Sequence, residues 1–148
     1  MKRNTLTSLA LLVIVALMGA CGNNAWDELP SDVANFVNMY FNGEVQSYTE
    51  TDTGSVVKLR NSATLTFDSN GQWTGVDGNG VPLPQQFLFD RLPAPLYRYI
   101  ESVEQTLDVM KVQRTTEGYR VWFADSAINY DNVTETISYF VGSAPDAA

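Results

Sequence analysis

The sequence contains no histidine, and its single cysteine is Cys21. Without histidine the chain lacks the commonest general base and the imidazole that activates many serine and cysteine nucleophiles. One cysteine cannot form an internal disulfide, and most zinc sites need several Cys or His ligands. The sequence also has no phosphate-binding glycine loop and no Gly-x-Ser-x-Gly nucleophile turn. We therefore expect a non-enzyme without cofactor or metal, with a Ser-Lys or paired-carboxylate enzyme left open as the alternative.

Basic residues are scarce: 9 Lys and Arg stand against 17 Asp and Glu, a net charge of −8. The first twenty residues begin with Lys2 and Arg3, continue with a mostly apolar run and end in small residues, which is typical of a secretory signal. Removal of 1–20 leaves 7 basic residues against 17 acidic ones, a net charge of −10. Such a chain has no general attraction for nucleic acid or anionic lipid.

Met18-Gly19-Ala20-Cys21 resembles a bacterial lipobox, in which the signal is cut before the cysteine and the thiol receives a lipid. Leucine is usual where Met18 stands, and a plain secretory signal is the alternative. Lipidation explains why an exported protein keeps one thiol, so we expect Cys21 to be the attachment site and the only contact with a membrane. Gly22, in place of Asp, resembles an outer-membrane destination. Residues 21–28 are then a short tether.

The segment from Leu29 to Asp68 recurs from Leu92 to Asp131 at a shift of 63 to 64 residues. Each copy opens with Leu-Pro and continues with apolar residues spaced as on one face of a helix. Each then breaks into short segments of alternating polarity, which is typical of strands with one buried face. Two copies of one α+β module explain this pattern best, and chance similarity of two amphipathic units is the alternative.

The modules are expected at 29–76 and 92–141, joined by a connector at 77–91 and followed by a tail at 142–148. Turn residues divide each module into one helix and several strands. We expect helices at about 30–41 and 93–107, and strands at 45–50, 56–60, 64–67, 72–76, 109–115, 118–124, 127–130 and 136–141. The apolar residues Phe87, Leu88 and Phe89 of the connector are expected to pack between the modules.

The pattern Leu-Pro-x-x-Val-x-x-Phe-Val-x-x-Tyr-Phe, followed by Gly-x-x-Val-x-Leu, Leu-x-Phe-Asp-x-x-Gly-x-Trp and a Val-Pro linker, resembles the PepSY-like, beta-lactamase-inhibitor-like lipoproteins of Bacteroidetes. The first copy carries it at 29–41, 54–59, 65–73 and 81–82, whereas the second has Asn132-Val133-Thr134 at the turn and no tryptophan after it. The resemblance implies one helix packed on a four-stranded antiparallel sheet in each module. Two modules side by side would leave a broad sheet face open. It also implies an exported binding or inhibitory module.

Two segments, Asp68-Ser69-Asn70-Gly71 and Asp77-Gly78-Asn79-Gly80, are similar to fragments of calcium-binding loops. Neither has a third oxygen ligand at the right step or the closing glutamate of an EF-hand. Asn-Gly is also the preferred pair for tight turns. We therefore interpret both segments as turns.

The alternation of the strands places charged residues on the open face. If Val57 and Leu59 face the helix, Lys58 and Arg60 face away, and the same parity exposes Arg120 and Trp122. The residues that we expect on this face are Lys58, Arg60, Lys111, Arg120 and Trp122. A solvated face that keeps the sheet from pairing with another chain is one interpretation. The other is a shallow site for an acidic peptide or glycan, with Trp122 as its main contact. The remaining aromatic residues are assigned to the core: Tyr48, Trp73, Tyr99, Tyr119 and Tyr130.

The sequence thus predicts a lipid-anchored, non-catalytic module that binds a protein or peptide through its open sheet face. A structural or accessory subunit of a cell-envelope assembly, docked through the connector residues 86–92, is the second hypothesis. A hydrolase would need a pocket with two converging carboxylates.

Overall fold

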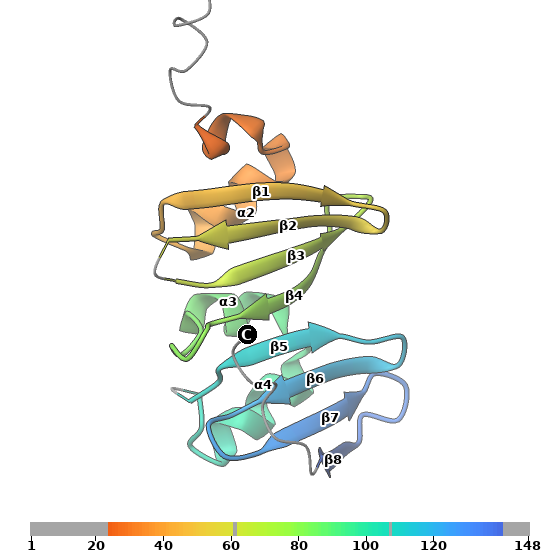
Figure 1. Cartoon of the computed structure of the whole chain (residues 1–148). Helices are drawn as coiled ribbons and strands as arrows, with labels where there is room; N and C mark the ends of the chain where they lie inside the picture. The colour runs from red at the N-terminus through yellow and green to blue at the C-terminus, as the bar shows by residue number, and fades with distance from the viewer. Residues whose placement is uncertain (1–23, 61, 107, 141–148) are drawn as a thin grey trace, which may run out of the picture.

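One antiparallel sheet runs through the whole computed structural model, which describes residues 24–60, 62–106 and 108–140. Its eight strands lie in chain order, from β1 to β8, and β4 pairs with β5, so the two modules share one sheet (Figure 1). The signal segment, Cys21 and the tail at 142–148 lie outside the described residues. The strands are β1 Val45–Thr51, β2 Gly54–Leu59, β3 Thr64–Asp68, β4 Trp73–Asp77, β5 Lys111–Arg114, β6 Gly118–Trp122, β7 Ala127–Asp131 and β8 Ile137–Phe140.

The helices lie on one face of the sheet and leave the other face without helical cover (Figure 1). They are the 3-10 helix η2 Ala25–Glu28 and the α-helices α2 Ser31–Tyr40, α3 Gln85–Arg91 and α4 Ala94–Ser102. The expected fold class, an α+β tandem of helix-on-sheet modules, is confirmed. The tether is shorter than expected, because η2 is ordered and Ala25 and Trp26 pack against the core.

The helix stripes and the strand parity agree with the sequence pattern. Val33 and Val37 of α2 are buried against the sheet, as are Leu96 and Ile100 of α4. The buried residues of β2 and β6 include Val57, Leu59 and Val121, and Phe123 directly after β6 is also buried. Helix α4 ends at Ser102, whereas the sequence pattern predicts a helix that continues to about 107. It ends earlier because Glu104 takes a left-handed conformation with φ 57°.

The connector contains a helix that the sequence pattern missed. Helix α3 brings the fully buried Phe87 into an aromatic cluster in which its ring centroid lies 5.1 Å from that of Trp73. Three further rings pack directly on Phe87, all from module one: Phe36, Tyr40 and Phe41. Burial of one such ring stabilises the fold by about 1.5–3 kcal/mol. Leu88 is also buried, but Phe89 is 64% exposed, so the expectation that it packs between the modules is wrong.

Equivalent turns in the two modules are stabilised by the same kind of hydrogen bond and the same close approach of two strands. Asp68 accepts hydrogen bonds from the backbone N–H groups of Asn70 and Gln72, and Asp131 accepts them from Val133 and Thr134. Opposite each aspartate stands a glycine, Gly54 or Gly118, at which a Cβ would lie 1.9 Å from a carbonyl oxygen of the neighbouring strand. Only glycine fits so close an approach of two backbones.

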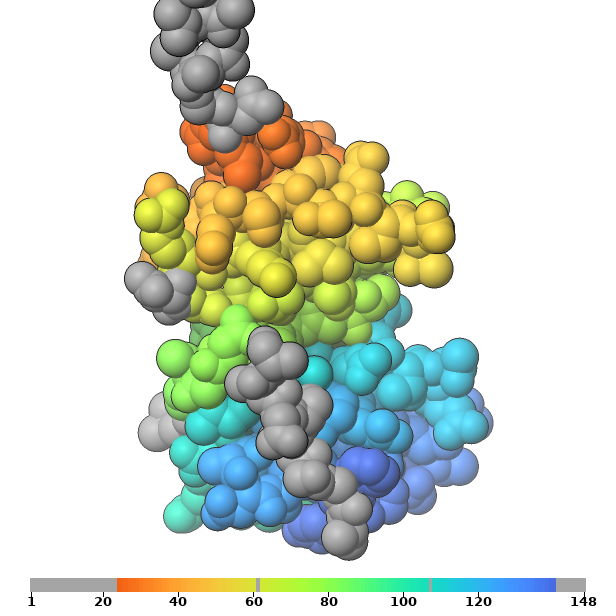
Figure 2. All heavy atoms as spheres, viewed as in Figure 1, coloured from red at the N-terminus to blue at the C-terminus, as the bar shows by residue number. Residues whose placement is uncertain are grey.

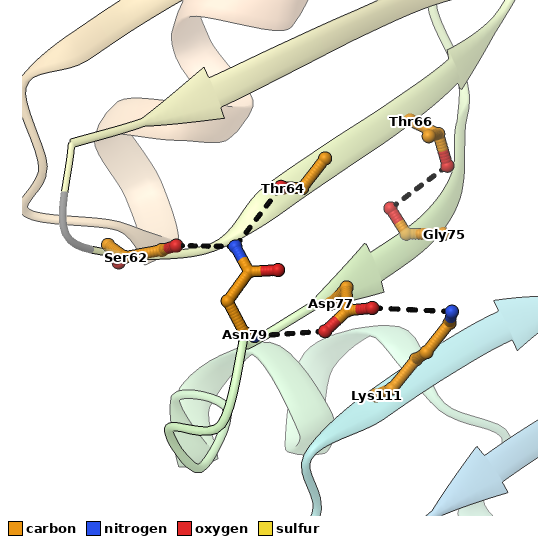
Figure 3. A network of polar contacts seen from close by, with 7 residues as sticks. All are labelled: Ser62, Thr64, Thr66, Gly75, Asp77, Asn79 and Lys111. Atoms are coloured by element: carbon orange, nitrogen blue, oxygen red, sulfur yellow. Dashed lines mark hydrogen bonds and ion pairs between the residues drawn. The ribbon is translucent and has the colours of Figure 1, made fainter. Parts of the chain in front are cut away.

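The loop after β4 is a turn of the same kind, seen in Figure 3. Asp77 accepts the N–H of Asn79, and the Asn79 amide donates to the Ser62 carbonyl oxygen at 2.7 Å and to the Thr64 hydroxyl at 3.1 Å. Asn79 has φ 52°, a left-handed conformation that asparagine tolerates. Both aspartate-glycine segments form turns in the structure.

Candidate binding site on the helix-free face

The strand register places the side chains of the helix-free face in transverse rows. One row crosses all eight strands, and three of the five predicted residues, Lys58, Lys111 and Trp122, belong to it. Arg120 lies in the adjacent row, between Gln113 and Asn129. The full row consists of Ser47, Lys58, Thr64, Asp77, Lys111, Trp122, Ala127 and Phe140. Figure 2 shows both modules from this side.

The two predicted cations of β2 and its end are far from the others. Lys58 is separated from Lys111 by β3 and β4, a distance of about 14 Å at the usual strand spacing. Arg60 lies beyond the end of β2, where its exposed guanidinium pairs with Glu44 at 3.5 Å. The five residues therefore do not form one basic patch, and only Lys111, Arg120 and Trp122 lie together.

Lys111 is already paired. Its ammonium nitrogen lies 3.3 Å from a carboxylate oxygen of Asp77, its register partner across the junction of the two modules (Figure 3). The same nitrogen lies 5.1 Å from the ring centroid of Trp122. Cations over aromatic faces are attracted by the ring quadrupole. The charge of Lys111 is thus already paired with Asp77 at the junction of β4 and β5, and a ligand would have to compete for it.

Trp122 is on the predicted side of the sheet but not in the predicted state. Its side chain is absent from the helix-side core and shares its row with Lys111, as expected from parity. Only 6% of it is exposed, however, so it is not the open contact residue that we expected. The guanidinium carbon of Arg120 lies 5.8 Å from the centroid of its ring. Alternation predicts on which face of the sheet a residue lies. It does not predict whether the long side chains of neighbouring residues cover it.

Arg120 is the best-defined cation of this face. Its Nε donates to Asn129 Oδ1 at 2.7 Å, and its guanidinium carbon lies 4.5 Å from the ring centroid of Phe140 on β8. It borders a shallow recess of about 480 Å³ at the ends of β5, β6 and β7. The residues on the recess wall that belong to strands or turns of the helix-free side are Thr115, Thr116, Glu117, Arg120, Asn129, Asp131, Thr136 and Ser138.

The sequence interpretation missed Asn129 and Phe140 as members of this site. Both follow from alternation, because Asn129 stands between the core residues Ile128 and Tyr130, and Phe140 pairs with Ala127 in the row of Trp122. The signal was present in the expected strands at 127–130 and 136–141. Neither residue is charged or a tryptophan, the residue types from which the binding face is predicted.

A second recess, of about 390 Å³, lies in module one between the start of α2 and the turns of the sheet. Its wall includes four carboxylates: Asp32, Glu50, Asp52 and Asp68. Asp68 is engaged in its turn, and Glu50 accepts a hydrogen bond from Tyr48 at 3.4 Å. Across the described part of the chain, no group of three or more His, Cys, Asp or Glu is arranged to hold a metal ion.

A tandem of two helix-on-sheet modules, joined edge to edge with all helices on one side, is the class that the fold defines. The family model described as "Putative beta-lactamase-inhibitor-like, PepSY-like" matches residues 52–134, more than half of the chain. The chain therefore belongs to the PepSY-like family. The match runs from the turn before β2 to the turn after β7 and includes the connector.

Solved structures from Bacteroides share this fold. A "putative periplasmic protein" of Bacteroides vulgatus is 19% identical, with a TM-score of 0.62 over 76% of this chain and 90% of its own. A "putative calcium-regulated periplasmic protein" of Bacteroides thetaiotaomicron is 18% identical, with a TM-score of 0.63 over 76% and 90%. A second Bacteroides vulgatus protein, described as of unknown function, is 20% identical, with a TM-score of 0.61 over 76% and 93%.

A search of the curated proteins found no match to this chain. In the part of the chain that the structure describes, every helix is too short or too polar to cross a bilayer.

Proposed function

We propose that this protein is an exported, lipid-anchored, non-catalytic module that binds a protein or peptide partner through the helix-free face of its sheet. The observation that carries the proposal is the one-sided cover of a single eight-stranded sheet (Figure 1). The face without helices presents hydroxyl, amide and charged side chains rather than a bare apolar surface. An exposed face of this kind suits reversible binding in water, where a polar rim and a few ring or guanidinium contacts set the affinity.

Export is supported by the signal-like start of the sequence and by the fold neighbours described as periplasmic. Lipid attachment rests on Cys21 and on the lipobox-like residues before it, with the outer membrane as the destination. Metabolic labelling with a clickable palmitate analogue tests the anchor. We expect label on the wild type and none on Cys21→Ser, and label on both variants would refute attachment at this residue.

The binding face is tested by photo-cross-linking in the native envelope. A photoreactive residue replaces Lys58 or Gln113 on the helix-free face, and Arg98 on the outer surface of α4 serves as the matched exposed control. We expect the same defined partner band from both sheet positions and none from position 98. Capture should then fall in the double variant Lys58→Glu plus Arg120→Glu and persist in Arg98→Glu. Equal cross-linking from both faces would contradict the proposal.

A structural or accessory subunit that docks through the connector is the second candidate. It is favoured by Phe89, which is 64% exposed on α3 and packs edge-to-face on Tyr97 at 5.3 Å. Phe87, which also belongs to the connector, is fully buried and cannot take part. A photoreactive residue at position 89 distinguishes the two candidates, because only docking through the connector predicts cross-links there.

A further inference from the structure

The recess beside Arg120 combines one prepared cation with two carboxylates. Stacking on Phe140 and the Nε bond to Asn129 hold the guanidinium in place. Within 24–60, 62–106 and 108–140, its two terminal nitrogens have neither a hydrogen-bond acceptor nor an ion-pair partner. A guanidinium fixed in this way is prepared for a carboxylate, because it loses little freedom when the ligand arrives.

The carboxylates lie at the other end of the recess. Asp131 is the register partner of Gly118, in the same-face row next to that of Arg120, and neighbouring rows lie about 7 Å apart along the strand. Glu117 precedes Gly118 in the turn after β5 and is exposed. Hydrogen bonds from the N–H groups of Thr134 and Val133 lower the pKa of Asp131, so it is charged at neutral pH. A ligand with two negative charges is therefore disfavoured here.

An extended peptide that lies along the strands has the same row spacing. Side chains at positions i and i+2 of a strand-like peptide point the same way and lie about 7 Å apart. A carboxylate at i would meet Arg120 while a cation at i+2 meets Glu117 and Asp131. The hydroxyls of the recess wall, at Thr115, Thr116, Thr136 and Ser138, can pair with its backbone.

We propose that this recess binds an extended partner segment of the form Glu-x-Lys or Asp-x-Arg, with its carboxylate on Arg120 and its cation between Glu117 and Asp131. The proposal rests on the proposed binding function and gives that function a ligand chemistry and a position. It moves the site away from Lys58, Arg60 and Lys111, toward the far half of the sheet.

Three synthetic peptides test the charge pattern: acetyl-Ser-Thr-Glu-Thr-Lys-Thr-Ser-amide and its analogues with Gln for Glu or Glu for Lys. Binding is followed by the NMR shift of the Arg120 Nε–H signal in the wild-type protein. We expect the dipolar peptide to bind at least about tenfold more tightly than either analogue, as each lacks one charge pair. Equal affinity of the three peptides, or binding of none of them, would overturn the proposal.

Variants locate the site. Backbone amide shifts should show lost binding of the dipolar peptide in Arg120→Gln and partial binding in Arg120→Lys, with thermal unfolding confirming that each variant is folded. Glu117→Gln, in an exposed turn, should keep binding but lose about half or more of the preference for Lys over Glu. Arg98→Gln, on the outer surface of α4 and outside the proposed binding face, should bind as the wild type does. Equal weakening by Arg98→Gln and Arg120→Gln would refute the assigned position.

The two proposals fail in different ways. If the peptides do not bind but partner cross-links at Gln113 persist, this inference is wrong and the binding face stands. If cross-links from the sheet positions are absent altogether, the proposed function fails regardless of the peptides.

Discussion

The two modules place equivalent strands in opposite surroundings. Strand β1 of module one is an edge strand, whereas its counterpart β5 lies inside the sheet between β4 and β6. Strand β4 is interior, whereas its counterpart β8 forms the other edge. Interior strands are hydrogen-bonded on both sides, but an edge strand keeps one row of unpaired backbone groups. The same repeated unit has therefore been fitted to different positions in one sheet.

The side chains follow this difference. Trp73 begins the interior strand β4 and is buried against Phe87, whereas β8 is four residues long and mostly exposed. In module two Tyr99 stands where module one has Phe36, and its hydroxyl hydrogen-bonds that of Tyr139 on the edge strand β8 at 2.8 Å. Module one also has the connector helix over its core, and module two has none beyond α4. The lesson is that the repeat specifies the module, whereas its neighbours specify how tightly the module is packed.

Removal of the Phe87 ring is expected to have the largest effect. Phe87→Ala leaves a cavity among the rings of module one and should lower the free energy of unfolding by about 3–5 kcal/mol. Urea unfolding followed by near-ultraviolet circular dichroism measures this. Hydrogen exchange of β6 and β7 in the same variant shows whether module two loses protection with module one, which would make the sheet one cooperative unit. Phe89→Ala is the control and should change stability by no more than about 0.5 kcal/mol.

Alanine at the matched glycines tests whether the repeat positions are equivalent. Gly54→Ala and Gly118→Ala each bring a methyl group against a backbone carbonyl, and each should cost about 1–3 kcal/mol. Thermal unfolding of the two variants should give similar losses. A loss of stability at Gly54 with none at Gly118 would show that the backbone of module two can shift to accept the methyl group, whereas that of module one cannot. Gly80→Ala, where a Cβ has no neighbour within 4 Å, isolates the cost of a positive φ alone.

The tyrosine pair tests the outer edge of module two. Tyr139→Phe removes the hydroxyl contact to Tyr99 and should cost about 0.5–1.5 kcal/mol, or less because the pair is exposed. The hydrogen bond to Tyr139 and burial raise the pKa of Tyr99 above 10.0, so this contribution is present below pH 10 and is lost as pH rises through the raised value. Ultraviolet titration should show the pKa of Tyr99 returning toward 10.0 in Tyr139→Phe. An unchanged titration would rule out the contact.

The smallest effect is expected at the turn between β7 and β8. Hydrogen bonds from the N–H groups of Thr134 and Val133 lower the pKa of Asp131 below 3.8, so its contribution to stability is present above that value and is lost as pH falls through the lowered one. Carbon-detected NMR should place its titration below the ordinary aspartate range. In Thr134→Pro, which lacks one of the donors, the pKa should move back up. No movement would mean that this donor is not the main cause.

Much of the fold was predictable because long, regular patterns carry it. The stripe of Val33 and Val37 and the alternation around Val57 and Val121 each repeat over a whole element, so the buried face follows from spacing alone. Helix α3 was not predictable in this way, because two turns after Pro84 are too short to show a helical period. The pairing of β4 with β5 was also hidden, since the connector separates them in the sequence.

The sheet face of the candidate residues was predictable from the sequence, whereas their contacts were not. Parity placed Arg120 and Trp122 on the correct face, because alternation fixes direction. It could not show that Lys111 pairs with Asp77, or that Arg120 rests on Phe140, because those contacts depend on register between strands that meet only in the folded sheet. Which charged side chains are available to a ligand therefore depends on their neighbours on adjacent strands.

The chain-order arrangement of the strands has a consequence for how the protein folds. Each strand pairs with the strand before or after it, so most native contacts join residues close in sequence, and such topologies fold fast. Within the sheet, the one pairing that closes a long loop is that of β4 with β5 across the connector. The entropic cost of closing a loop grows only slowly with the length of the loop. A chain that is synthesised from its amino end can therefore complete one hairpin after another, before its last residues have been added.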